Sequence, residues 1–277
     1  MRIVVIGGGH AGIEAACAAA RMGADAVLLT MHLDTIAQMS CNPSIGGIAK
    51  GHLVKEIDAL GGVMARAADA TGIHFKVLNR SKGPAVRATR SQNDKAAYRL
   101  YLKRLLENTP GLALVQGLAA GVEVRGGRAC GVRLADGETL AADAVVVCSG
   151  TFLDGRIFIG AASYAAGRAN EPPAVELARD VRDLGFEVLR LKTGTPMRLH
   201  ADSIDWVRFA PQPGDEPPPS FSRSTRRPVR NRVLCYLGHT TPEAARVVRE
   251  HLHLSPLYCG RIRGVGPRYC PSIEDKV

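Results

Sequence analysis

The sequence predicts an α/β protein whose N-terminal part is a doubly wound, Rossmann-like parallel sheet. The wholly apolar residues 3–6 are typical of a parallel strand that is covered on both faces. A glycine cluster follows them and leads into the alanine-rich residues 11–22, which we expect to form a helix that ends at Gly23. A second apolar segment, residues 26–30, completes a β-α-β unit.

The rest of the chain continues to alternate between strands and helices. Residues 31–91 have an irregular pattern, with one helix over 51–62 and loop-like segments at 40–47 and 82–90. A helix over 93–108 would place Tyr98, Leu102 and Leu105 on one face. Further expected elements are a strand at 112–115, a hairpin of strands 122–124 and 130–134 around Gly126-Gly127, an apolar strand at 144–148 and a helix at 173–184.

Composition limits the class of protein. Of the 277 residues, 46% are hydrophobic and 22% are charged, the usual balance of a soluble α/β protein. The net charge of +10 favours a polyanionic partner such as nucleic acid, the alternative being an ordinary basic surface or a bound dinucleotide. The seven cysteines include no CxxC pair, which favours neither a disulfide framework nor a metal site. No segment is long enough to span a membrane, so we expect a cytoplasmic protein.

The glycine cluster is a candidate dinucleotide site. Gly7-Gly8-Gly9-His10-Ala11-Gly12 satisfies G-x-G-x-x-G between a strand and a helix. Gly7 would permit the tight turn, Gly9 the approach of a pyrophosphate, and Gly12 close packing of helix on strand. The helix N-terminus would supply N–H groups and a positive dipole end for the phosphates.

The position of this cluster indicates FAD. A fingerprint at the extreme N-terminus, a long excursion and a return strand ending in Ser149-Gly150-Thr151 are the layout of flavoproteins that bind two dinucleotides. The acidic residue expected after the second strand is absent, because Thr30 and Met31 stand there. Asp25 lies before that strand and Asp34 after it, so ribose recognition must differ from the simplest pattern.

We expect two lobes. Residues 1–152 would form the FAD-binding Rossmann-type domain with an irregular insertion at 31–92, and residues 153–277 a second α/β lobe for NAD or substrate. A Rossmann sheet normally takes at least one further strand from the C-terminal side. The C-terminal part of the fold is therefore expected to be missing from this chain.

Two cysteines are candidate reactive groups. Cys41 stands in a Gly/Pro-rich loop that could face a ligand, and Cys270 follows Arg268 at a spacing that places both on one side of an extended segment. The alternative for a lone cysteine is a small buried hydrophobic residue, which Cys17 and Cys148 fit.

Two basic segments stand out. Lys82, Arg87 and Arg90 could bind phosphate, a folate tail or an RNA backbone, or form a solvated basic turn. The arginines at 223–232 are expected to form a flexible surface stretch.

Six runs spread over the sequence carry a family signal: GGGHAGIEAA, MSCNPSIGGIAKGHLVKEIDALGG, SKGPAVRATRSQ, GTFLDGRIFIG, LKTGTP and GVGPRYCPSIEDKV. Together these runs resemble the MnmG (GidA) family of tRNA uridine 5-carboxymethylaminomethyl modification enzymes. The resemblance extends from end to end of this chain, whereas the family's chains are longer and include a helical C-terminal region implicated in tRNA and partner binding, absent here.

The resemblance implies a reaction at the wobble uridine of tRNA. It would add a carboxymethylaminomethyl or aminomethyl group at C5, with methylenetetrahydrofolate as one-carbon donor and glycine or ammonium as the amine. FAD and NADH would handle the redox step, a GTPase of the MnmE type would be the partner, and the full-length protein would be a homodimer.

The resemblance also implies site residues. The family's functional cysteines fall on Cys41 and Cys270, and its FAD contacts on residues 7–12, Ala119 and Ala174, where the family often has serine. The proposed NAD stretch falls on Gly266, Pro267, Arg268, Tyr269, Cys270, Pro271, Ser272, Ile273, Glu274, Asp275, Lys276 and Val277.

Three alternatives remain open. A folate- and FAD-dependent tRNA uracil methyltransferase shares the fingerprint, but the GVGPRYCPSIEDKV run argues against it. A flavin disulfide reductase would need a CxxC or CxxxxC pair, which the sequence lacks. The third is a folded but inactive FAD-binding fragment.

Overall fold

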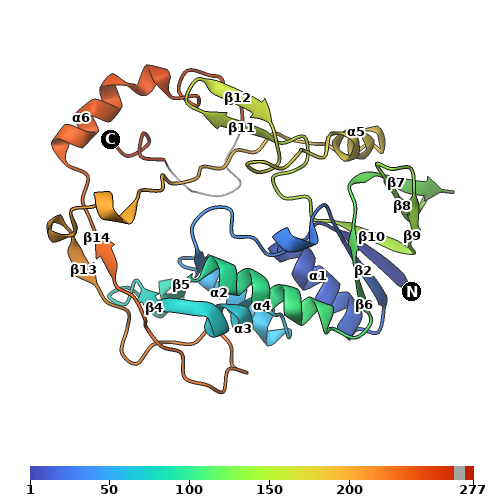
Figure 1. Ribbon diagram of the computed structural model, residues 1–277, viewed down its shortest axis with the longest axis horizontal. Helices are drawn as coiled ribbons and strands as arrows, with labels where there is room; N and C mark the ends of the chain where they lie inside the picture. Colours follow the sequence, from blue (N-terminus) through green and yellow to red (C-terminus); the bar gives the residue numbers. More distant parts are fainter. Residues whose placement is uncertain (265–271) are drawn as a thin grey trace. The chain divides into compact units, whose positions relative to one another are not determined.

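The computed structural model describes residues 1–264 and 272–277, and its chain divides into two units (Figure 1). The first unit contains Met1–Gly150 and the return segment Pro211–Cys235; the second contains Thr151–Ala210 and Tyr236–Val277. The first division of the chain lies close to the boundary expected after residue 152. The return segment, however, packs with the first unit and not with the second lobe.

The first unit is built on a four-stranded parallel sheet in the order β10-β1-β2-β6. Val4 and Val5 of β1, one of the two inner strands, are fully buried, as expected of a parallel strand covered on both faces. The apolar return strand predicted at 144–148 is confirmed beside the first strand. The strands are β1 (Arg2–Ile6), β2 (Asp25–Thr30), β6 (Leu112–Gln116) and β10 (Ala144–Val147).

Helix α1 (His10–Arg21) packs on this sheet through a face of small side chains and one isoleucine. Ile13, Ala16 and Cys17 are buried along its inner face. Gly23, with φ of +83°, allows the chain to leave the helix and enter β2. The predicted β-α-β unit is therefore confirmed.

The insertion between β2 and α4 (Lys95–Glu107) is more regular than predicted. It contains a three-stranded antiparallel sheet in the order β3-β5-β4 and two helices, of which only α2 was expected. Strand β5 reads ATRSQN and has no apolar run that would predict a strand. Its extended conformation results from pairing with β3 on one side and β4 on the other. The elements are β3 (Ser44–Gly46), α2 (Lys50–Ala59), α3 (Met64–Thr71), β4 (Gly72–Leu78) and β5 (Ala88–Asn93).

Helix α4 (Lys95–Glu107) follows the insertion and begins at a side-chain cap. Asp94 Oδ1 accepts the N–H groups of Ala96 and Ala97, at 2.9 and 3.0 Å. The buried face carries Tyr98 and Leu102, as predicted, and continues to Leu106. Leu105 is only partly buried, because the i, i+4, i+8 row determines which side faces the core.

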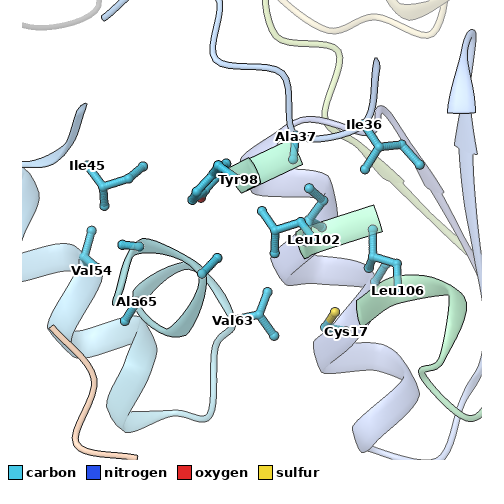
Figure 2. Packing of buried hydrophobic residues seen from close by; sticks show 14 of the residues in the cluster. Cys17, Ile36, Ala37, Ile45, Val54, Val63, Ala65, Tyr98, Leu102 and Leu106 are labelled. Carbon is cyan, nitrogen blue, oxygen red and sulfur yellow. The ribbon is translucent and has the colours of Figure 1, made fainter. Parts of the chain in front are cut away.

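One hydrophobic core joins the parallel sheet to the insertion. The buried side chains come from α1, α4, the loop after β2 and the helices of the insertion, and Figure 2 shows them converging around Tyr98 and Leu102. The insertion is thus part of the first unit's core. The labelled members are Cys17, Ile36, Ala37, Ile45, Val54, Val63, Ala65, Tyr98, Leu102 and Leu106.

A carboxylate on α1 fixes the start of α3. The Glu14 side chain accepts the N–H groups of Val63 and Met64, at 3.0 and 2.8 Å. These two N–H groups lie at the helix N-terminus, where no intrahelical partner exists. Glu14 therefore caps a helix that begins 50 residues later in the sequence.

The return segment covers the open edge of β4. The Val77 N–H donates to Asp215 Oδ2 at 2.6 Å and the Phe75 N–H to Asn231 Oδ1 at 2.7 Å. The Arg232 N–H donates in turn to the Ile73 carbonyl at 2.8 Å. Side chains and backbone of the return segment thereby satisfy groups that an edge strand otherwise exposes.

A second set of contacts anchors the middle of the return segment. Asp69 of α3, which is 8% exposed, accepts the N–H groups of Phe221 (2.8 Å) and Ser222 (2.9 Å) and the Thr225 hydroxyl (2.6 Å). Asp58 of α2 accepts the Ser222 hydroxyl at 2.6 Å. Burial raises the pKa of Asp69, and these donors partly offset that effect.

A β-hairpin completes the first unit. Gly126 and Gly127 both have positive φ, +55° and +75°, as the tight turn predicted there requires. The hairpin is confirmed, and a third antiparallel strand extends it. The strands are β7 (Ala119–Arg125), β8 (Arg128–Leu134) and β9 (Thr139–Ala141).

The second unit has shorter elements. It contains a hairpin, β11 (Arg156–Ile159) and β12 (Ala162–Ala165), and the helices α5 (Val175–Asp183) and α6 (Pro242–Glu250). The paired strands β13 (Ala210–Gln212) and β14 (Cys235–Leu237) lie where the chain passes between the units. Within residues 1–264 and 272–277, no helix has the length and apolar character needed to cross a membrane.

We predict that Asp69→Ala destabilises the 277-residue chain by roughly 2–3 kcal/mol, because two buried backbone N–H groups lose their acceptor. Urea unfolding followed by circular dichroism measures this. Asp183→Ala, at an exposed position at the end of α5, is the matched control and should change stability by less than about 0.5 kcal/mol. Equal effects of the two variants would contradict the anchoring role of Asp69.

Candidate functional site

The glycine loop between β1 and α1 is closed by contacts that exclude a side chain. A Cβ built on Gly7, whose φ is +113°, would lie 2.3 Å from the Cys148 carbonyl oxygen. A Cβ on Gly12 would lie 1.8 Å from the Gly7 carbonyl oxygen. Strand β1, helix α1 and the end of β10 therefore approach one another in a way that only glycine permits.

The middle of the loop is open. A Cβ built on Gly9 would meet nothing within 4 Å, and Gly9 is exposed at the N-cap of α1 without a side-chain cap. The first-turn N–H groups of α1 and its positive dipole end face this position. The geometry suits a phosphate or pyrophosphate group.

The end of β2 reaches the same loop. A Cβ on Gly8 would lie 2.9 Å from Thr30 Oγ1. The Asp34 carboxylate forms an ion pair with the Lys103 ammonium at 2.6 Å, and this contact lowers the pKa of Asp34. The Asp25 carboxylate lies 3.6 Å from the Arg2 guanidinium. Thr30 is therefore the side chain that β2 offers near the loop, in place of the acidic residue that holds ribose in the simplest pattern.

His10 and Tyr98 form an aromatic pair behind the loop. Their ring centroids are 5.6 Å apart. His10 Nε2 and the Tyr98 hydroxyl are buried without a hydrogen-bond partner in the part of the chain that the structure describes. Burial lowers the pKa of His10 and raises that of Tyr98, so both rings are neutral at pH 7. His10 was a predicted cofactor residue, whereas its contact with Tyr98 had no signal in the sequence.

The two predicted alanine contacts lie in different units. Ala119 opens β7 in the first unit and is 5% exposed. Ala174 precedes α5 in the second unit, and its N–H donates to the Phe152 carbonyl at 2.7 Å. Their role as FAD contacts stays a prediction.

Cys41 lies exposed in the loop before β3. Lys95 at the start of α4 donates from Nζ to the Cys41 carbonyl at 2.9 Å, and the Asn93 N–H donates to the Pro43 carbonyl at 2.6 Å. The loop that carries the candidate cysteine is therefore tied to the junction of β5 and α4. Lys95 was not predicted here, although its place directly after the Asp94 cap fixes its position on the helix.

The second predicted cysteine, Cys270, lies outside the described residues, together with Gly266, Pro267, Arg268, Tyr269 and Pro271. Of the predicted NAD stretch, residues 272–277 are described in the second unit. The Ser272 N–H and the Tyr258 hydroxyl donate to Asp275, at 2.7 and 2.6 Å. The Tyr258 hydrogen bond lowers the pKa of Asp275. Whether Cys41 and Cys270 act together stays a prediction.

The three basic candidates do not belong to one loop. Lys82 and Arg87 are exposed around the turn at Pro84–Val86, and Arg87 lines an open hollow of about 400 Å³ with Val77 and Arg80. Arg90, predicted in the same loop, lies in β5 and its Nε is buried. The loop prediction is wrong for Arg90, because strand pairing extends to Ala88.

Cys17 and Cys148 of the first unit fit structural roles. Burial raises the pKa of Cys17 to about 11 and also raises that of Cys148. Thiols of this kind stay protonated at neutral pH. In the described part of the chain, no group of three or more His, Cys, Asp or Glu side chains is arranged to hold a metal ion.

Comparison with known proteins shows one family over nearly the whole chain. The family model described as glucose inhibited division protein A (GidA) matches residues 2–277. Proteins named tRNA uridine 5-carboxymethylaminomethyl modification enzyme MnmG are similar over 275 residues, at 52% identity in Syntrophotalea carbinolica and 54% in Geobacter sulfurreducens. The crystal structure of Aquifex aeolicus GidA is similar with a TM-score of 0.92 and 49% identity.

The coverage of these relatives is unequal. The alignments span 99% of this chain but 44% of each of the two curated relatives and 47% of the Aquifex aeolicus chain. This chain therefore spans less than half the length of the relatives that it matches.

We predict that Gly12→Ala destabilises the chain by about 3 kcal/mol or more, because its Cβ cannot fit beside the Gly7 carbonyl. Gly9→Ala is the matched control in the same loop, with open space at its Cβ and an expected cost below about 1 kcal/mol. Thermal unfolding without added ligand measures both. A Gly12→Ala chain as stable as wild type would contradict the close approach of α1 and β1.

Proposed function

This chain belongs to the GidA family, and we propose that it is the flavin-binding part of an enzyme that modifies the wobble uridine of tRNA. Its relatives of 52% and 54% identity are named tRNA uridine 5-carboxymethylaminomethyl modification enzymes, which supports a carboxymethylaminomethyl product at C5. In the proposed reaction, methylenetetrahydrofolate supplies the one-carbon unit, glycine or ammonium supplies the amine, and a GTPase of the MnmE type is the partner.

One observation carries the flavin site. The glycine loop has open space at Gly9, in front of the α1 N-terminus. This loop belongs to a chain that matches the family model from residue 2 to 277. We assign the FAD pyrophosphate to this space, with Gly7, Gly8, Gly9, His10, Ala11 and Gly12 as its backbone cradle. Ala119 and Ala174 are proposed as further FAD contacts. FAD, reduced by NADH, would supply the electron-transfer chemistry of the reaction.

The cysteines would activate the uracil ring. C5 of uracil is a weak nucleophile until a group adds to C6, and a thiolate makes that addition by forming an S–C6 bond. C5 then has enolate character and forms a bond to the methylene carbon of the folate donor. The bond between that carbon and the folate nitrogen breaks, the folate leaves as tetrahydrofolate, and the amine takes its place on the carbon. Loss of the C5 proton and cleavage of the S–C6 bond restore the ring. We assign these steps to Cys41 and Cys270 together, without dividing the roles of nucleophile and acid or base between them.

The remaining assignments rest on the family resemblance. Residues 266–277 are the proposed NAD stretch, and Lys82, Arg87 and Arg90 are candidates for contacts to phosphate, folate or RNA. The intact enzyme would be a cytoplasmic homodimer.

We predict that the purified 277-residue chain binds FAD and that Gly9→Ala weakens this binding roughly tenfold or more, or ~1.4 kcal/mol. The added methyl group occupies the space proposed for the pyrophosphate. Titration followed by flavin fluorescence measures the affinity. Gly83→Ala, another glycine whose Cβ would meet nothing within 4 Å, is the control and should bind FAD normally. A wild-type chain that binds no FAD would refute the flavin assignment.

A second prediction concerns Cys41. In the assembled enzyme with its GTPase partner, Cys41→Ser should abolish the modified nucleoside while FAD stays bound, because a serine hydroxyl is a far weaker nucleophile toward C6. Mass spectrometry of nucleosides from the tRNA measures the product. Cys259→Ser, at the other exposed described cysteine, should leave the product unchanged. Full product formation by Cys41→Ser would remove Cys41 from the reaction.

A further inference from the structure

One short part of the return segment carries five positive charges, a number equal to half of the sequence's net charge of +10. Five arginines fall within ten residues, and no acidic residue occurs between positions 217 and 239. All five are exposed, and their guanidinium groups make no ion pair or hydrogen bond to the part of the chain that the structure describes. This arginine segment consists of Arg223, Arg226, Arg227, Arg230 and Arg232 with the residues between them.

The arginine segment is held at both ends. At its start, the Arg223 N–H donates to Asp58 Oδ2 at 3.1 Å, directly after the contacts of Phe221 and Ser222 with Asp69. At its end, Asn231 and Arg232 bond to the edge of β4. The flexible stretch predicted from composition is therefore anchored to α2, α3 and β4.

Two apolar side chains in or beside the arginine segment, Phe221 and Val229, point inward. Phe221 is 3% exposed and belongs to the core of the first unit, and Val229 is 8% exposed. The exposed surface of residues 223–232 is therefore cationic and polar, and the exposed apolar side chains Val233 and Leu234 lie just after it in the chain. A surface of this charge suits the phosphates of a nucleic acid better than the apolar anchor of a protein interface or a membrane-bound segment. An arginine guanidinium can donate two parallel hydrogen bonds to two oxygens of one phosphate. Because the backbone of the segment is anchored before binding, less conformational entropy is lost when a ligand binds.

We propose that the arginine segment 223–232 binds the sugar-phosphate backbone of the tRNA substrate. The inference rests on the proposed function for the identity of the RNA. Phosphate contacts position an RNA without reading its sequence, so the segment would contribute affinity and orientation for any tRNA. It would act in addition to the cysteines and the flavin site, and it contains none of the residues assigned to either.

The test compares two double substitutions that remove the same charge from the same unit. Arg226→Gln/Arg227→Gln neutralises the middle of the arginine segment, and Arg125→Gln/Arg128→Gln neutralises two exposed arginines at the tip of the β7–β8 hairpin. Binding of an unmodified tRNA transcript with a fluorescent end label is followed by anisotropy from about 50 to about 200 mM salt.

The segment variant should bind the transcript roughly tenfold more weakly at about 50 mM salt. The slope of log affinity against log salt should fall by about 2, because each of the two arginines would neutralise one phosphate of the RNA. The hairpin variant should stay within about twofold of wild type. Equal weakening in the two variants would overturn the proposal, because it would reflect net charge alone, and so would an unchanged segment variant.

A third variant distinguishes the loss of charge from a structural effect of substituting these two residues. Arg226→Lys/Arg227→Lys keeps both charges and should retain the wild-type salt slope to within about 0.5. A slope as low as that of the glutamine variant would overturn the proposal, since the weaker binding would then not follow charge.

The proposed function is assessed separately on the same samples by FAD titration. RNA binding that requires the arginine segment in a chain without FAD affinity would support the segment and count against the flavin assignment. A chain that binds FAD but no transcript at about 50 mM salt would overturn the segment proposal and leave the flavin site standing.

Discussion

The first unit depends on carboxylates that accept backbone N–H groups from segments remote in sequence. Glu14 of α1 caps α3, and Asp69 of α3 holds the turn at residues 221–225. Each step connects the Rossmann helix to a more distant part of the chain. A buried N–H group without an acceptor costs about 1–3 kcal/mol, so each carboxylate stabilises a connection that apolar packing alone would leave unspecific.

The same framework positions the candidate chemistry. The glycine loop is shaped by the close approach of Gly7, Gly12 and the Cys148 carbonyl, and the Ala37 N–H donates to the Gly8 carbonyl at 2.9 Å. Cys41 follows shortly after Ala37 in the chain, and its loop is tied to α4 through Lys95. The proposed flavin cradle and the candidate nucleophile therefore extend from one core.

The structure shows where part of the molecule's positive charge lies, namely on the anchored return segment of the first unit. Composition indicates a polyanionic partner but does not say where it binds. The carboxylates that hold the return segment accept its backbone N–H groups and its hydroxyls, and no guanidinium of the arginine segment bonds to them within the described residues. The anchoring thus leaves these cations available to a ligand. This is the physical basis for assigning RNA contacts to this surface.

The sequence by itself determined the elements whose signal is local: the β-α-β unit with its glycine loop, helix α4 and the Gly126-Gly127 hairpin. Apolar runs, a helical spacing of apolar residues and glycine pairs act within a few residues, so they can be recognised without the fold. Only the tertiary structure decided that polar β5 is a strand, that Lys95 holds the Cys41 loop, and that the arginine segment is anchored. These depend on partners up to 165 residues away, and a hydrogen bond between remote groups leaves no periodic trace in the sequence.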